Sequence, residues 1–151
     1  MEIAVSEQQG IVPVTVYRIK GDIDGNTYHL LEDQAKASIA AGTRYLLLDL
    51  TDVPFMSSAG LRALHSIFAW LSSEEASDEA AKQRNAGLLA GTYKSPYLKL
   101  YKPSKRVLQA MSLAGYDMFL EVFDDFQKAL DSFWLDFLAK QPGSERSPMP
   151  Q

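Results

Sequence analysis

The stretch 46–62 constrains the fold more than any other part of the chain. It begins within a short apolar run, 45–50, that is typical of a buried central strand. A turn follows, and Ser57 and Ser58 then open a helix, expected over about 58–71, whose apolar residues form one stripe. Both hydroxyls lie where backbone N–H groups lack partners and the helix dipole is positive. A phosphate group would be tolerated there, so the segment indicates a switchable binding surface rather than a reaction centre.

The composition indicates one globular domain. The chain has 151 residues, of which 46% are hydrophobic and 23% charged, so it can bury a core of its own. A net charge of −4 argues against nucleic acid as the main partner. The absence of cysteine excludes disulfides, thiolate metal sites and a cysteine nucleophile. No apolar run approaches the ~18–20 residues that span a bilayer, so we expect no direct membrane insertion. With no export signal visible, we expect a cytoplasmic location.

Hydrophobic periodicity predicts alternating strands and helices. Strands are expected at 3–5, 12–19, 45–50, 97–101 and 118–122. Helices are expected from Asn26 or Thr27 to Gly42, over 58–71, from Ser104 to Gly115, and over 124–140. The first two strands form a hairpin around a turn at 7–10. This order is typical of an α/β domain.

Two segments do not follow this alternation. The first half of 72–96 is polar and rich in alanine, and it is either a solvated helix or a mobile acidic loop. The tail 141–151 contains three prolines and no core-forming pattern, so we expect disorder there. The domain is therefore expected to span 1–140.

Catalysis by the serines is not expected. His29 and His65 are the available bases, and His65 lies seven positions after Ser58, about 10 Å along the same helix. The Gly-x-Ser-x-Gly motif of serine hydrolases is absent. The acidic residues are neither accompanied by histidines nor spaced as the ligands of a metal site are. We expect no enzymatic activity, no metal and no cofactor.

Two consecutive motifs resemble the signature of the STAS domain, the fold of anti-sigma factor antagonists. They are Leu-Asp-Leu-Thr-Asp-Val at 48–53 and Phe-Met-Ser-Ser-Ala-Gly-Leu-Arg-Ala-Leu at 55–64. In that family a strand ending in Leu-Asp-Leu-Ser precedes a Met-Asp-Ser-Ser-Gly-Leu loop. Laid residue by residue, Ser58 falls on the family's phosphorylated serine. Ser57 replaces the preceding acidic residue, so Ser57 is an alternative acceptor.

Other segments extend the resemblance to about residues 3–133. Gly-Asp-Ile-Asp at 21–24 is similar to the family's Gly-Glu-Leu-Asp element, and Thr27 matches a threonine that opens the first helix. The resemblance implies one STAS-like domain with a mixed four- to five-stranded sheet and amphipathic helices packed mainly on one face. It also implies that 72–96 is a variable insertion.

The resemblance implies a phosphorylation-switched binding protein in transcription regulation. It would bind an anti-sigma factor or related serine kinase, release it when Ser58 is phosphorylated, and be reset by a serine phosphatase. Phosphorylation adds ~1.5 to 2 negative charges, which a helix start tolerates but a docked partner does not. The residues expected to bind the partner are Asp22, Asp24, Asn26, Thr27, Ser57, Ser58, Ala59, Gly60 and Arg62.

The last helix leaves an alternative function open. Late apolar residues of the last helix are expected to be core or a self-association surface: Phe133, Trp134, Leu135, Phe137 and Leu138. They favour a scaffold or adaptor that is not phosphorylated, such as a homodimer or a subunit of a transport or signalling assembly.

A basic cluster is expected on a solvated surface, or facing acidic protein or lipid headgroups: Lys94, Lys99, Lys102, Lys105 and Arg106.

Overall fold

The computed structural model describes residues 1–73 and 78–140 and contains a five-stranded sheet in the order β1-β2-β3-β4-β5. The strands are β1 (Glu2–Gln8), β2 (Val14–Lys20), β3 (Leu46–Asp52), β4 (Leu98–Tyr101) and β5 (Val122–Phe123). β1 and β2 are antiparallel, and the other neighbouring strands are parallel. Because β2, β3 and β4 run in the same direction, the loops that follow them emerge at one edge of the sheet.

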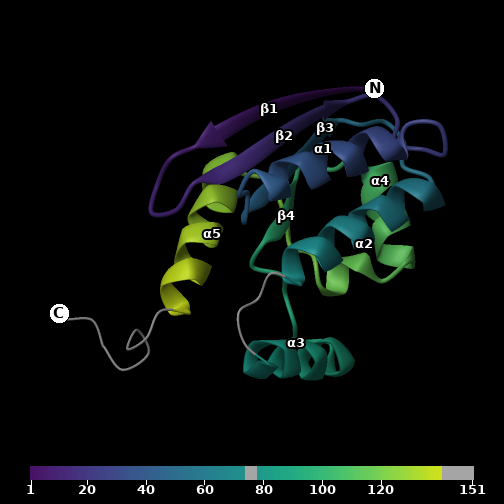
Figure 1. The fold of residues 1–151 in the computed structure, drawn as a ribbon. Coiled ribbons are helices and arrows are strands. Elements are labelled where there is room, and N and C mark those ends of the chain that lie inside the picture. Colours follow the sequence, from purple (N-terminus) through teal and green to yellow (C-terminus); the bar gives the residue numbers. More distant parts are fainter. Residues whose placement is uncertain (74–77, 141–151) are drawn as a thin grey trace.

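Helices connect the parallel strands and cover the sheet. They are α1 (Tyr28–Ala40), α2 (Ser58–Ser72), α3 (Asp78–Ala90), α4 (Lys105–Leu113) and α5 (Phe126–Ala139), with a short 3₁₀-helix η1 (Tyr116–Met118). Figure 1 shows α1, α2 and α4 together beside the sheet, α5 apart from them, and α3 away from the strands. This arrangement confirms the predicted α/β class with a mixed sheet.

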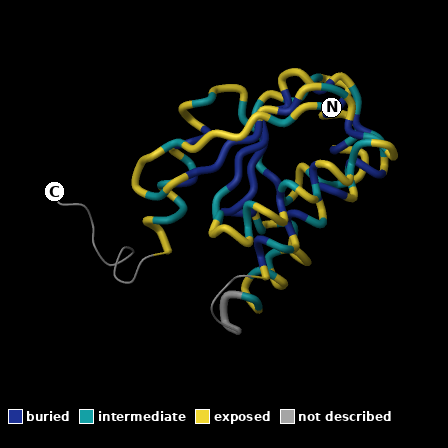
Figure 2. Tube along the Cα trace, turned by 45° about the horizontal axis from the view of Figure 1, so that its top comes forward, coloured by how far each residue is buried: buried dark blue, intermediate teal, exposed yellow. Residues whose placement is uncertain are grey.

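The main core lies between the sheet and α1, α2 and α4. Tyr17 and Ile19 of β2 and alternate leucines of β3 pack there against apolar side chains of these helices. The five residues 46–50 are all buried, as Figure 2 shows for the strands at the centre of the sheet. A strand covered on both faces explains why this run lacks the polar alternation of a solvent-facing strand.

A smaller core lies on the opposite face, beneath α5. Leu130 and Phe133 pack there against Val14, Val16 and Leu47. This assigns Phe133 to the core. Two other late apolar residues face outward, because 65% of Leu135 and 42% of Leu138 are exposed. A self-association surface on α5 therefore stays a prediction.

The structure corrects two predicted boundaries. The short strand predicted at 118–122 exists but begins later, at Val122. Gly115 adopts a left-handed conformation (φ 81°) and caps η1, which occupies the chain up to Met118. Only Val122 and Phe123 pair with the short strand β4. The turn predicted at 7–10 also begins too early, because β1 continues to pair with β2 through Gln8.

The segment 72–96 contains the helix that was one of its two predicted alternatives. Helix α3 covers 78–90 and is separate from α2. Residues 74–77 and the tail 141–151 lie outside the described residues, so the predicted disorder of the tail and the limits of the domain stay predictions.

Lys99 does not belong to the predicted basic surface. Its side chain is fully buried under α5, with Nζ 2.6 Å from Asp136 Oδ2, 2.9 Å from Ser132 Oγ and 3.1 Å from Glu121 Oε1. Lys99 pairs with Leu47 across β3 and β4 and so points to the same face as that leucine. The alternation of side chains along β4 thus directs Lys99 into the protein and not to the solvated surface on which it was expected.

Candidate functional site

The loops after β2 and β3 lie side by side at one edge of the sheet. Ile23 and Met56 form a parallel bridge outside the main strands. The Ile23 N–H donates to the Phe55 carbonyl at 3.0 Å, and the Ser57 N–H donates to the Ile23 carbonyl, also at 3.0 Å. These bonds bring the predicted segment 22–27 next to the two serines.

Ser57 caps helix α2. Its backbone is extended (φ −86°, ψ 179°), and its Oγ accepts from the Ala59 N–H at 3.2 Å and the Gly60 N–H at 3.4 Å. An N-cap side chain of this kind satisfies backbone donors that have no partner within the helix. The Ser57 hydroxyl is thus engaged in holding the helix start.

Ser58 is the first residue of α2, and its side chain is exposed. Within residues 1–73 and 78–140, no hydrogen bond involves its hydroxyl. The two adjacent serines therefore differ: the first hydroxyl caps the helix, and the second is exposed to solvent. Sequence alone left both as acceptors.

The loop 22–27 is a hydrogen-bonded turn. Thr27 Oγ1 accepts from the Asp24 N–H at 2.9 Å and donates to the Asp22 carbonyl at 2.8 Å. Asp24 Oδ1 accepts from the Asn26 N–H at 2.9 Å. Asp24 and Thr27 shape the turn, whereas Asp22 and Asn26 are exposed on its outside. Thr27, one of the two residues at which this helix was expected to begin, makes no side-chain bond to the N–H groups of α1, because its hydroxyl faces back into the loop.

Ala59 and Gly60 are buried, so they shape the predicted docking surface from beneath. A Cβ at Gly60 would lie 2.5 Å from the Ile23 carbonyl oxygen and 2.7 Å from Met56 Cγ. Only a residue without a side chain allows the start of α2 to approach the Ile23 backbone so closely. The glycine fixes the position of Ser58 relative to the neighbouring loop.

Gly60→Ala is expected to lower the free energy of unfolding by about 1 to 3 kcal/mol, since the added methyl group overlaps a backbone oxygen that cannot rotate away. Urea denaturation followed by circular dichroism measures the change. Gly25→Ala is the matched control in the adjacent loop, because nothing lies within 4 Å of its Cβ position. Equal effects of the two substitutions would show that the close approach at Gly60 does not affect the free energy of unfolding.

Cationic and aromatic side chains surround this edge of the sheet. Arg62 is exposed one helical turn after Ser58. Its charge partly opposes the burial that raises the pKa of Tyr116. The Arg106 guanidinium of α4 lies 4.9 Å from the centre of the Phe55 ring. Phe55 was not predicted as a site residue, because no local pattern shows that α4 reaches this loop.

A hollow of about 620 Å³ lies beside these loops, between the ends of β2 and β3 and the start of α4. It is lined by Lys20, Gly21, Thr51, Asp52, Val53, Pro54 and Ser104. The surface next to the loop that leads to Ser58 is therefore concave, because Val53 and Pro54 of that connection line the hollow.

We also searched the described residues for a metal site and for a membrane-spanning helix. Within them, no group of three or more His, Cys, Asp or Glu side chains could hold a metal ion. None of their helices is both long and apolar enough to cross a bilayer. His65, on the same helix as Ser58, packs with its ring 5.9 Å from Phe68 and 6.3 Å from Tyr116.

The comparisons with known proteins agree with this arrangement. The model of the STAS domain matches residues 2–76, which include β1, β2, β3 and the whole of α2. No curated protein matches the chain.

Several solved structures share the fold. An anti-sigma factor antagonist from Mycobacterium paratuberculosis has a TM-score of 0.61 at 20% identity, covering 88% of this chain and 95% of that one. An anti-sigma-factor antagonist (STAS) domain protein from Planctomyces limnophilus has a TM-score of 0.60 at 14% identity, covering 86% and 97%. The Bacillus cell fate determinant SpoIIAA in its phosphorylated form has a TM-score of 0.53 at 16% identity, covering 85% and 97%.

Proposed function

Because the chain belongs to the STAS domain family, we propose that it is a partner-switching regulatory protein without enzymatic activity. It binds an anti-sigma factor that is also a serine kinase while Ser58 is unmodified, and it releases this partner once Ser58 is phosphorylated. A serine phosphatase restores the binding form, and the cycle runs in the cytoplasm. The observation that carries the proposal is the exposed Ser58 hydroxyl beside the loop 22–27. SpoIIAA, which shares the fold, has been solved in both unphosphorylated and phosphorylated forms.

A phosphate on Ser58 is compatible with the folded domain. It would lie at the positive end of the α2 dipole, which stabilises an exposed anion by about 0.3 to 1 kcal/mol. Arg62, four residues later, is on the same face of the helix and adds a cation in the favourable orientation. The Ser57 cap and the Gly60 contact lie on the inner side of the loop and stay in place.

The same phosphate would disrupt a docked partner. At an interface, a phosphate dianion loses its hydration, and if the partner presents no cation to it, Arg62 alone does not offset that cost or the repulsion from the partner's carboxylates. A loss of about 3 kcal/mol weakens binding more than a hundredfold. The switch therefore needs no change of fold.

Phosphate mapping tests the proposed acceptor. The protein is incubated with ATP and an anti-sigma kinase from its own genome, and the modified residue is located by mass spectrometry. We expect phosphate on Ser58 in the wild type and in Ser57→Ala, but none in Ser58→Ala. Ser57→Ala removes the cap and costs about 1 kcal/mol, so its folding is checked by circular dichroism. Phosphate found only outside 57–58, or retained in Ser58→Ala, would contradict the proposal.

A second candidate is an adaptor that associates with itself or with another subunit and is not phosphorylated. The exposed Leu135 and Leu138 on α5 favour it. Light scattering of the wild type and of Leu135→Glu/Leu138→Glu distinguishes the two functions. A dimer that the substitutions convert to a monomer would support the adaptor, whereas a monomer in both forms would remove its support.

A further inference from the structure

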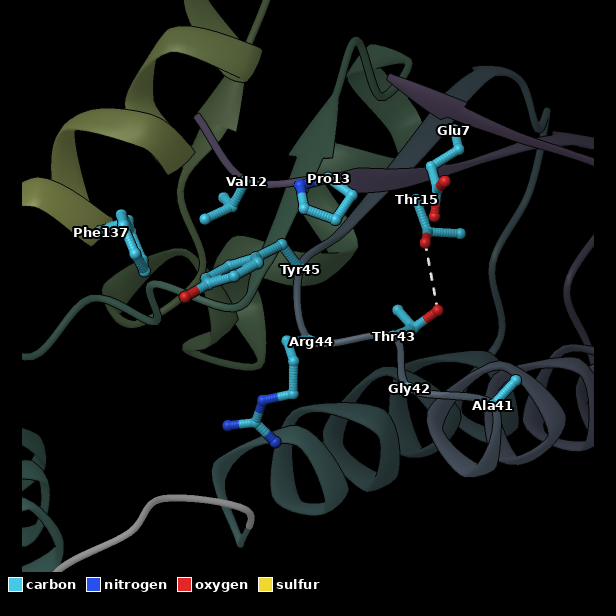
Figure 3. A pocket seen from close by; sticks show the side chains of 10 residues that line it. All are labelled: Glu7, Val12, Pro13, Thr15, Ala41, Gly42, Thr43, Arg44, Tyr45 and Phe137. Atoms are coloured by element: carbon cyan, nitrogen blue, oxygen red, sulfur yellow. Dashed lines mark hydrogen bonds between the residues drawn. The ribbon is translucent and has the colours of Figure 1, made fainter. Parts of the chain in front are cut away.

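A separate cavity of about 500 Å³ lies at the opposite edge of the sheet from Ser58. It is enclosed by the start of β2, the connection from α1 to β3, and the end of α5, as Figure 3 shows. β3 begins beside this cavity and ends beside the Ser58 loop, so the length of a seven-residue strand, roughly 20 Å, separates the two. The volume is within the range of about 300 to 1,000 Å³ of pockets that bind small molecules.

One half of the cavity is polar and negative. Glu7 is exposed at the rim beside Thr15, and its Oε1 also accepts from the Gln9 amide at 2.8 Å. The Thr15 hydroxyl lies 3.1 Å from the Thr43 hydroxyl (Figure 3). Helix α1 ends at this wall, and its last turn carries no basic residue, so the negative end of its dipole is not compensated there. A carboxylate, two hydroxyls and a helix C-terminus together favour a positively charged group with several N–H donors.

Arg44 also lines the cavity but does not cancel this preference. Its guanidinium lies 5.3 Å from the centre of the Tyr97 ring. Figure 3 shows the Arg44 side chain directed away from Glu7 and from the threonine pair. The guanidinium therefore lies at the side of the cavity away from Glu7, and a cation beside Glu7 would not be in contact with it.

The other half of the cavity is apolar and aromatic. Val12, Pro13, Tyr45 and Phe137 form it, and the Tyr45 and Phe137 rings meet edge to face with their centres 6.4 Å apart. Burial raises the pKa of Tyr45, the neighbouring Tyr97 adds to the shift and Arg44 opposes it, so the phenol is neutral at physiological pH. Walls of this kind accept a flat hydrocarbon or aryl group, and their ring faces also attract cations.

We propose that this cavity binds a small organic cation with an aryl tail, its ammonium group at Glu7, Thr15 and Thr43 and its tail against Tyr45 and Phe137. The inference goes beyond the proposed function, because it needs neither Ser58 nor the protein partner. The charge of the ligand follows from the polar half of the cavity, and its shape follows from the aromatic half.

The probe for this site is 2-phenylethylamine, titrated into the full chain and followed by amide chemical shifts in nuclear magnetic resonance. Its neutral and anionic analogues, 2-phenylethanol and 3-phenylpropanoate, have the same ring and a similar length. We expect saturable shifts at Thr43 and Tyr45 with the amine, and affinities at least about fivefold lower for both analogues, because the ion pair and the helix dipole are lost.

Glu7→Lys is expected to weaken binding of the amine at least about fivefold, since it reverses the charge at the polar end. Glu2→Lys, an exposed substitution at the other end of β1, is the matched control and leaves the affinity unchanged. Ser58→Ala also leaves it unchanged, which separates this test from that of the proposed function. The proposal would be overturned by equal binding of the propanoate, by shifts confined to residues outside the cavity, by equal losses in both lysine variants, or by no saturation below about 10 mM.

Discussion

Ser58→Asp is expected to weaken binding of the partner kinase at least a hundredfold, whereas Ser58→Ala keeps the affinity of the wild type. The aspartate places a carboxylate at the exposed start of α2, where the partner is proposed to dock. An unpaired charge buried at an interface costs about 3 kcal/mol, which corresponds to this loss. Isothermal titration calorimetry with the purified kinase measures both affinities.

Ser6→Asp is the control for the added charge. Ser6 is exposed on the edge strand β1, away from the loops 22–27 and 55–58. We expect its affinity for the kinase to equal that of the wild type. Equal affinities of Ser58→Ala and Ser58→Asp would contradict a switch at this residue, and an equal loss in Ser6→Asp would show a general charge effect instead.

Lys99→Met is expected to lower the free energy of unfolding by about 3 kcal/mol. The substitution keeps the length of the side chain but removes the cation that holds Asp136, Glu121 and the Ser132 hydroxyl together. Breaking a buried ion pair by removing one partner costs about 3 to 5 kcal/mol. We expect the lower end, because the Asp136 and Glu121 side chains are 41% and 37% exposed and water can reach them. Guanidinium denaturation measures the change.

Lys105→Met is the matched control, because Lys105 is exposed in the first turn of α4. Its effect is expected within about 0.5 kcal/mol. Lys99→Met/Asp136→Leu is expected to recover part of the loss, since apolar groups can replace a buried ion pair. A Lys99→Met protein as stable as the wild type would show that the cluster does not hold α5 on the sheet.

The elements around Ser58 were predictable because their signals are local. The run 45–50 lacks polar alternation, which fits a strand covered on both faces. The serines follow it directly and precede a regular apolar stripe, which indicates a helix start. The difference between the two hydroxyls was not predictable, because it depends on which one turns back toward the N–H groups of Ala59 and Gly60.

Features that depend on tertiary packing were missed, because no signal in the local sequence reports them. In the sequence, Lys99 resembles an ordinary surface lysine. It is buried because α5 places Ser132 and Asp136 over its side chain. The contact between Arg106 and Phe55 joins a residue of α4 to a loop residue far away in the chain. The strand predicted at 118–122 has suitable composition, but β4 is short and leaves pairing partners for only two residues.

We propose that one phosphate on Ser58 abolishes docking and leaves the domain folded. The most direct measurement prepares the chain fully phosphorylated at Ser58, then compares its affinity for the kinase and its thermal midpoint with those of the unmodified chain. We expect the phosphorylated chain to have an affinity at least a hundredfold lower and a thermal midpoint within about 4 °C of that of the unmodified chain, since the helix start accommodates the charge. A phosphorylated chain that binds as tightly as the unmodified one, or that loses its fold, would contradict it.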